Sequence, residues 1–431
     1  MNFYIHTLGC KVNKYESQIM TEALINAKYE LCENSKEADI TIVNSCTVTS
    51  VSDSKAMKLL RKIKRENSNT ILVLTGCLPQ AFPNIKEKFD IADIVLGNKC
   101  RADLLPSIEK FLINKEKIYQ IEPHKNDISF EKMTVHTFNE RTRAFVKIED
   151  GCNRFCSFCI IPFARGRVRS KPLDELKEEI ELLSKQNYKE VVLVGINLSA
   201  YGQELDKNLA DAIETACSVD GIQRVRLGSL EPERMDIDML KRLVKQEKLC
   251  PQFHLSLQSG CDETLKRMNR HYDSTEYMEI VNNIRDIFPN PSITTDVMVG
   301  FPGETEEEFK KSCKFVEDVG FAKVHVFAYS RRAGTVADKA KNQIDSNTKE
   351  VRSKEMIKLT DKRTADFLLT QIGKEEEVLF ERLKNDGYYE GYSKNYTHII
   401  SKCNENISGQ IRKALVKDVE NGKCICEIIN S

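Results

Sequence analysis

An α/β protein in three parts is predicted from this sequence of 431 residues. Strand-like apolar runs alternate with amphipathic helical stretches near the start, and the alternation restarts at a larger scale from Arg143. The last segment instead holds short β-like runs separated by Gly and Asn. Alternating strands and helices form parallel sheets, whereas short strands joined by turns form sandwiches or barrels. We therefore expect an N-terminal open parallel-sheet domain, a partial (βα)6 barrel and a small C-terminal all-β barrel.

The first part is predicted to span residues 1–118. Its apolar runs predict strands, and its 3.6-residue periodicity predicts helices between them. The strands are expected at Asn2–Thr7, Asp39–Asn44, Thr70–Thr75 and Ile91–Leu96, and the helices at Tyr15–Ala27, Ser54–Asn67 and Ala102–Ile113. Residues 119–141 are polar and irregular, which indicates a linker.

The second part is predicted to span residues 142–370 and to hold six strands, too few for a complete eight-unit barrel. They are expected at Ala144–Ile148, Glu190–Val194, Arg224–Leu227, Phe253–Leu257, Ile293–Val299 and Lys323–Ala328. Helices are expected between them, for example at Leu173–Gln186 and Glu304–Val319, and a long one at Asn347–Leu369. Residues 371–431 then predict the small β-barrel.

Composition narrows the function classes. Lys plus Arg equals Asp plus Glu at 65 each, so any nucleic-acid surface has to be a local patch. There is no apolar run long enough to span a membrane, and the start lacks the pattern of a secretion signal, so we expect a cytoplasmic protein with no membrane contact. Fifteen cysteines in a reducing compartment indicate metal binding or catalysis in preference to disulfides.

The strongest local motif is Cys152-x3-Cys156-x2-Cys159, which directly follows the first strand of the expected barrel. Three thiolates in eight residues suit a compact iron–sulfur cluster, since soft thiolates are its preferred ligands. With three ligands for four irons, one iron stays open to a small molecule. The alternative is a zinc site, which needs a fourth ligand in a familiar spacing; the next histidine after the motif is His254.

Three further cysteines are far apart in sequence, but each follows a predicted strand: Cys10 in TLGC, Cys46 in VNSC and Cys77 in LTGC. The carboxyl ends of parallel strands lie along one edge of a sheet, where ligands bind. These thiols are therefore expected to converge on a second cluster, the alternative being three unrelated buried cysteines. The other nine cysteines have no ligand spacing and are expected to be structural.

With these motifs in place, the chain resembles the methylthiotransferase family of radical S-adenosylmethionine (SAM) enzymes over essentially its whole length. The family has three cysteines in its N-terminal domain, a radical SAM barrel with C-x3-C-x2-C, and a C-terminal TRAM domain. Matching motifs are NSCTVT at 44–49, VRLGSLEP at 225–232, LSLQSG at 255–260, VGFPGE at 299–304 and SRRAGT at 330–335. The opening TLGCKVNKYES most resembles the subgroup that acts on N6-threonylcarbamoyladenosine at position 37 of tRNA. Lys14, and Leu78–Pro79 after the third cysteine, depart from that subgroup's usual pattern.

The resemblance implies two [4Fe-4S] clusters and SAM as cofactors. The Cys152/Cys156/Cys159 cluster would hold SAM and cleave it to a 5′-deoxyadenosyl radical, which takes hydrogen from C2 of the adenine. The Cys10/Cys46/Cys77 cluster would deliver the sulfur, which is methylated by a second SAM. The partners implied are the tRNA anticodon loop with adenosine 37 and an electron donor protein; the sequence indicates no oligomeric state.

Further SAM contacts are expected at the other strand ends, although each residue could equally be a helix cap or a turn residue. The candidates are Gly195, Asn197, Glu231 and Gln258. RNA contacts are expected in two basic runs and four tyrosines; the runs could instead be solvated faces. They comprise Arg154, Arg165, Arg167, Arg169 and Lys171; Lys55, Lys58, Arg61, Lys62, Lys64 and Arg65; and Tyr388, Tyr389, Tyr392 and Tyr396.

Three alternatives stay open at this point. The same chemistry could act on isopentenyladenosine 37 of tRNA or on a ribosomal protein. The chain could carry a single cluster. It could also be a non-enzymatic RNA-binding protein that is merely stabilised by its metal.

Overall fold

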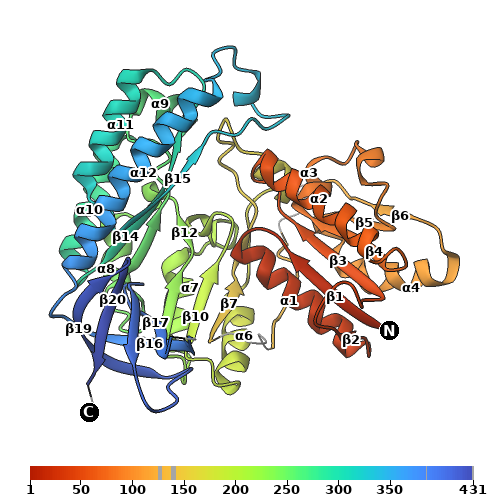
Figure 1. Cartoon of the computed structure of the whole chain (residues 1–431), viewed down its shortest axis with the longest axis horizontal. Helices are drawn as coiled ribbons and strands as arrows, with labels where there is room; N and C mark the ends of the chain where they lie inside the picture. The colour runs from red at the N-terminus through yellow and green to blue at the C-terminus, as the bar shows by residue number, and fades with distance from the viewer. Residues whose placement is uncertain (125–128, 137–141, 385, 430–431) are drawn as a thin grey trace.

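The computed structural model describes residues 1–124, 129–136, 142–384 and 386–429. Its elements form three groups along the chain, as expected (Figure 1). The N-terminal sheet lies on one side, the large barrel in the middle, and the small C-terminal barrel packs against the end of the large one. No helix in the described part of the chain is long and apolar enough to cross a membrane.

The N-terminal group is a fully parallel six-stranded sheet in the order β2-β1-β3-β4-β5-β6. Helices α1 and α4 pack on one face around Phe3 and Ile42, and α2 and α3 cover the other around Val43 and Leu74, so both faces are buried. The bounds are β1 Asn2–Thr7, α1 Lys11–Asn26, β2 Glu30–Leu31, β3 Ile40–Ser45, α2 Ser50–Glu66, β4 Ile71–Gly76, α3 Cys77–Ala81, β5 Ile94–Leu96, α4 Leu104–Asn114 and β6 Ile118–Gln120.

Several boundaries differ from the sequence-based expectation. Helix α1 begins at Lys11, four residues before the expected start, and Cys10 occupies its N-cap position without a capping side-chain hydrogen bond. Helix α2 begins at Ser50 because Thr49 accepts a hydrogen bond from the Ser52 amide. Strand β6 pairs with β5 and extends the sheet into the segment that was expected to be linker.

The central group is an open barrel of parallel strands in sequence order, with six strand positions because β11 and β12 are interrupted only at Gly228. The strands are β7 Arg143–Lys147, β10 Glu190–Val194, β11 Arg224–Leu227, β12 Ser229–Leu230, β13 Gln252–Leu255, β14 Ser292–Val299 and β15 Lys323–Ala328, with a small hairpin of β8 Glu149–Asp150 and β9 Arg169–Ser170. The helices are α5 Ile161–Arg165, α6 Leu173–Lys185, α7 Leu209–Ser218, α8 Ile237–Leu243, α9 Asp262–Arg267, α10 Ser274–Ile287, α11 Glu306–Val319 and α12 Ser346–Leu369. Helix α11 begins two residues later than expected because Thr305 and Glu308 form a capping box.

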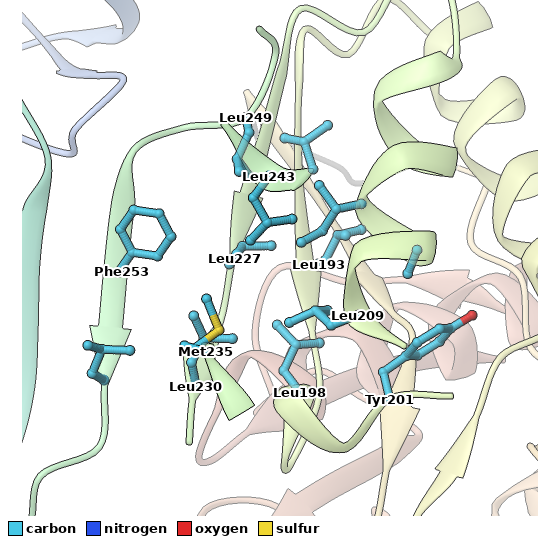
Figure 2. Packing of buried hydrophobic residues seen from close by; sticks show 14 of the residues in the cluster. Leu193, Leu198, Tyr201, Leu209, Leu227, Leu230, Met235, Leu243, Leu249 and Phe253 are labelled. Carbon is cyan, nitrogen blue, oxygen red and sulfur yellow. The ribbon is translucent and has the colours of Figure 1, made fainter. Parts of the chain in front are cut away.

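Successive side chains along the barrel strands point alternately outward to the covering helices and inward to the barrel interior. Leu193 and Leu227 point outward and pack with Leu209 and Leu243 of the covering helices (Figure 2). The neighbouring residues Val192 and Val194 face the interior, which is consistent with the two-residue period of a strand. The hydrophobic core thus lies between strands and helices, and the interior of the barrel is left for a site.

The C-terminal group is a closed five-stranded barrel, as expected, in the order β16-β17-β18-β20-β19. Its strands are β16 Glu375–Leu383, β17 Tyr388–Ser393, β18 His398–Lys402, β19 Ile411–Glu420 and β20 Lys423–Ile428. It is fixed to the amino ends of the large barrel's strands: Arg224 donates to the Tyr392 carbonyl (3.0 Å) and Arg226 to the Lys394 carbonyl (2.9 Å).

Candidate active site

The loop with the C-x3-C-x2-C motif lies between β8 and α5 and is fixed by backbone contacts. The Cys152 amide donates to the Gly166 carbonyl (3.0 Å), and the Ser157 amide donates to the Met268 carbonyl (3.0 Å). At Gly151, φ is +89°, and a Cβ atom would lie 2.0 Å from the Arg167 carbonyl oxygen. Glycine is therefore required where this loop leaves the strand.

The three thiols of this loop, which we call the loop triplet (Cys152, Cys156 and Cys159), interact electrostatically with one another. Burial raises the pKa of Cys152 to about 11 and that of Cys159 to about 12. Without metal Cys152 and Cys159 are protonated at neutral pH, so cluster binding has to release their protons.

Donors around the loop triplet are aimed at sulfur. Arg270 donates from Nη1 to Cys156 Sγ (3.3 Å), and Asn197 donates from Nδ2 to Cys152 Sγ (3.7 Å). Hydrogen bonds to cysteine sulfur favour the thiolate and tune a bound cluster. Nothing in the sequence pattern singled out Arg270, which lies 114 residues from Cys156.

The structure brings Cys10, Cys46 and Cys77 together at the carboxyl ends of β1, β3 and β4, three neighbouring strands. We call them the edge triplet. A Cβ atom at Gly9, where φ is +112°, would lie 2.7 Å from Cys46 Cβ, so only glycine permits this approach. Asn13 joins the strand ends by donating to the carbonyls of Leu8 (2.9 Å) and Ser45 (3.0 Å). Burial raises the pKa of Cys10, and it raises that of Cys46 to about 11.

Arg165 connects the edge triplet to the barrel domain. It lies on α5, just after the loop triplet, and donates from Nε to Cys77 Sγ (3.3 Å). Its other nitrogens donate to Glu16 (2.6 Å), Asn13 (2.9 Å) and Asp150 (3.2 Å). The side chain is fully buried. Its role was missed because sequence reasoning treated it as part of an RNA-binding run.

That basic run needs correction. Arg165 is buried as described, and Lys171 is buried in contact with Glu179 and the Met133 carbonyl, so neither can reach RNA. Arg154 pairs with Glu233, whereas Arg167 is exposed. On α2, Lys64 pairs with Asp93 (2.7 Å), and the exposed basic residues are Lys55, Lys58, Arg61, Lys62 and Arg65.

The tyrosines of the small barrel also need correction as a base-stacking surface. Tyr389 is in its core. Tyr392 and Tyr396 stack on each other with ring centroids 4.6 Å apart, and the Arg143 guanidinium lies over both rings. They close the lower end of the large barrel. Tyr388, half-buried beneath Lys402, is the remaining member.

The four residues expected to contact SAM lie around the barrel mouth. Asn197 Oδ1 and Gln258 Oε1 are buried and have no protein partner within the described residues, which fits polar contacts with a bound ligand. Gly195 lies against Glu149: a Cβ there would be 2.6 Å from Glu149 Oε2, which also accepts from the Asn197 amide (2.7 Å). Glu231 instead pairs with Arg270 (2.5 Å), so it lies behind a residue that contacts Cys156.

Glu149 is a second residue that sequence reasoning missed. Burial raises its pKa well above the usual range, and its Oε1 is without a protein partner in the described region. A carboxyl group that prefers its neutral form can donate a hydrogen bond as well as accept one.

Each triplet offers three cysteine sulfurs, which are the ligands that iron–sulfur clusters take. Among the residues that the structure describes, no three His, Cys, Asp or Glu side chains are grouped so as to hold one metal ion. In a cluster, iron and sulfide separate the cysteine ligands, so its thiols stand further apart. The zinc alternative therefore finds no ligand set in this part of the chain.

A cavity of about 860 Å³ begins beside Cys10 and Gly195 and continues through the barrel interior to Tyr392 and Tyr396. This is the size of pockets that bind small molecules. The parallel barrel, the cysteine loop at the carboxyl end of its first strand and this cavity define a radical SAM enzyme.

Comparisons with known proteins extend this conclusion. A model described as the Radical SAM superfamily matches residues 146–316, and one described as Uncharacterized protein family UPF0004 matches residues 2–97. The radical SAM methyltransferase TsrM from Kitasatospora setae, solved with cobalamin and a [4Fe-4S] cluster, shares the fold with a TM-score of 0.57 at 13% identity, covering 78% of this chain and 76% of that one.

Curated relatives cover nearly the full length. "Threonylcarbamoyladenosine tRNA methylthiotransferase MtaB" is 34% identical in Bacillus subtilis (strain 168), covering 95% of this chain and 92% of the relative. The protein of that name in Thermotoga maritima is 38% identical, covering 91% and 89%. "tRNA-2-methylthio-N(6)-dimethylallyladenosine synthase" of Clostridium botulinum (strain Loch Maree / Type A3) is 35% identical, covering 89% and 87%. This chain belongs to the methylthiotransferase family of radical SAM enzymes, whose cofactors are SAM and two [4Fe-4S] clusters.

Proposed function

We propose that this enzyme attaches a methylthio group to C2 of N6-threonylcarbamoyladenosine at position 37 of tRNA, in the cytoplasm, with electrons from a donor protein. The observation that supports it most is the contact of Arg165 with Cys77, which joins the edge triplet to the barrel segment that follows the loop triplet. The two relatives named for this substrate resemble the chain over about nine-tenths of its length.

The six cysteines are proposed to hold the two clusters, the loop triplet one and the edge triplet the other. When bound, the cofactors supply radical chemistry and sulfur. The chain's own residues orient and enclose them. Asn197 and Gln258 present unpaired oxygens toward a ligand, Gly195 keeps the wall clear of a side chain, and Glu231 positions Arg270 against Cys156.

The N-terminal domain and the barrel have to keep a fixed relative position for this chemistry, because the reacting carbon has to reach both triplets. Besides Arg165, a buried ion pair joins the barrel to the N-terminal domain. Arg332 of the loop after β15 donates to Asp53 of α2 (2.7 Å) and to Thr47, next to Cys46. The tRNA is proposed to approach over the exposed basic face of α2 (Lys55, Lys58, Arg61, Lys62 and Arg65) and Arg167.

Mass spectrometry of tRNA nucleosides tests the substrate. Cells that lack this protein should lose the 2-methylthio derivative of N6-threonylcarbamoyladenosine and accumulate its precursor. Persistence of that derivative, with loss of 2-methylthio-isopentenyladenosine or of a methylthio group on a ribosomal protein, would assign the corresponding alternative. Normal levels of all three, with zinc and no SAM cleavage in the purified protein, would support a non-enzymatic RNA-binding protein.

A further inference from the structure

The interior cavity carries a charge pattern that the proposed chemistry does not use. Its walls include polar side chains from successive strands: Gln252 and His254 of β13, Thr294 and Asp296 of β14, and His325 of β15. Its entrance adjoins Cys10, beside the position where a reacting base has to lie. A group attached to that base could therefore extend into the barrel.

Lys11 begins beside the entrance, and its side chain interacts with charges at the lower end of the barrel. It directly follows Cys10, and the next residue, Val12, is buried against Val192 and Val194 on the inner face of β10, which fixes the start of α1 inside the barrel. Lys11 lines the cavity and is accessible from it. Within the described residues, its ammonium group makes no hydrogen bond or ion pair that the structure records.

Most of the charges that act on Lys11 within the described residues are positive. Arg143, Arg226 and Lys14 are close enough to repel it, and Glu190 is the acidic group that attracts it. Glu190 is already paired with two other cations, because it accepts a hydrogen bond from Arg226 (2.8 Å) and lies 3.8 Å from Arg143. Among the described residues that line the cavity, two lysines, Lys11 and Lys323, face one carboxylate, Asp296, and this excess of positive charge favours an anionic ligand.

The proposed substrate supplies such an anion. A threonylcarbamoyl group attached to N6 of adenine ends in a carboxylate, whereas an isopentenyl group is neutral. We infer that the barrel cavity receives the N6 substituent and that the Lys11 ammonium binds its carboxylate. Lys11 thereby selects an acid-bearing adenosine over one with a neutral substituent. This inference rests on the proposed function and names the recognition site within it.

The test uses anaerobically reconstituted holoenzyme and fluorescently labelled anticodon stem-loops. One RNA carries N6-threonylcarbamoyladenosine, and the other carries its methyl ester, which lacks the charge and is larger by one methyl group. Dissociation constants are measured by fluorescence anisotropy for the wild type, Lys11→Met, Lys11→Arg and Lys14→Met. Lys14 is the control for loss of a nearby positive charge, because it is exposed on the same helix and acts on Lys11 but does not line the cavity.

Lys11→Met should weaken binding of the acid about tenfold and change binding of the ester by less than about twofold, as expected for a lost charge-assisted contact. Lys11→Arg should keep most of the preference for the acid RNA over the ester RNA, and Lys14→Met should keep all of this preference. Iron content and SAM cleavage should match the wild type in each variant. Equal weakening of acid and ester in Lys11→Met, or no weakening of either, would overturn the inference.

The proposed function is tested separately in the same preparation. If wild-type enzyme forms no methylthio product on the acid RNA, the proposed function fails whatever the binding ratio. If it forms product and Lys11→Met retains the preference for acid over ester, the Lys11 inference alone fails.

Discussion

Arg165 donates a hydrogen bond from Nε to the Sγ atom of Cys77 over 3.3 Å, although 88 residues separate them in sequence. The same guanidinium contacts Glu16 and Asp150, so it belongs to a buried network that includes both domains. The edge triplet is thereby joined through one side chain to helix α5, which follows the loop triplet in the barrel domain. This arrangement makes the relative position of the two domains part of the site.

Removing that side chain should uncouple the edge triplet from the barrel domain. Arg165→Met leaves Glu16 and Asp150 with fewer buried partners, and breaking a buried ion pair from one side costs about 3–5 kcal/mol. We expect a lower unfolding midpoint in denaturant and loss of methylthio product. Arg167→Met, at an exposed neighbour, is the control. Wild-type stability and product formation in Arg165→Met would contradict the bridging role.

The Arg332–Asp53 pair should be strongly coupled. Both side chains are nearly buried, so either single neutral variant, Arg332→Met or Asp53→Asn, should destabilise the protein by about 3–5 kcal/mol. The double variant should lose much less free energy of unfolding than the sum of the losses in the two single variants, as measured by a double-mutant cycle in denaturant. Arg331 pairs with Asp338 at the surface, and the same cycle there should give about 0–1 kcal/mol. Additive losses at Arg332 and Asp53 would mean that the pair does not fix the domains.

Acid should destabilise the network around Glu16. Burial alone would raise the pKa of its carboxyl, but the charges of Arg101, Arg165 and Lys147 hold that pKa at about 2, against 4.5 for the free group. The unfolded chain therefore binds a proton at higher pH than the folded one, and stability from this group is lost as the pH falls from about 4.5 toward about 2. The loss amounts to about 3 kcal/mol. Chemical denaturation of the metal-free protein across this pH range should show that the free energy of unfolding falls more steeply with decreasing pH in wild type than in Glu16→Gln. Equal slopes of unfolding free energy against pH would contradict this role of Glu16.

The turn before the loop triplet should not tolerate a side chain. In Gly151→Ala, the new Cβ would be 2.0 Å from the Arg167 carbonyl oxygen, so the loop has to move and the reconstituted enzyme should lose the ultraviolet–visible absorption and SAM cleavage of one cluster. Gly373→Ala is the matched control, because φ is +82° there and a Cβ meets nothing within 4 Å. Full SAM cleavage in Gly151→Ala would show that this backbone contact is dispensable.

Patterns within a short window predicted much of the fold. The strands at 190–194 and 323–328 were predicted to the residue. Short runs with β-branched residues between two helical stretches indicate strands. The placement of Cys10, Cys46 and Cys77 after three strands also predicted their approach, since parallel strands end at a common edge.

What the sequence did not reveal depends on long-range partners. Arg165 and Lys171 look like members of a solvated basic run, and their burial follows from Glu16, 149 residues from Arg165, and from Glu179. Arg270 carries no motif, and it gains its role only when the fold brings it to Cys156 and Glu231. The early start of α1 was missed because Cys10 gives no capping signal.

Iron content measured together with reaction products, in single cysteine variants reconstituted anaerobically, tests the two-cluster arrangement most directly. Cys77→Ala should retain about four of eight irons and SAM cleavage but form no methylthio nucleoside, and Cys152→Ala should lose both SAM cleavage and product. Cys100→Ala, at a buried cysteine outside both triplets, should match the wild type. A Cys77→Ala enzyme with the full iron content and normal methylthio product would contradict the two-cluster arrangement.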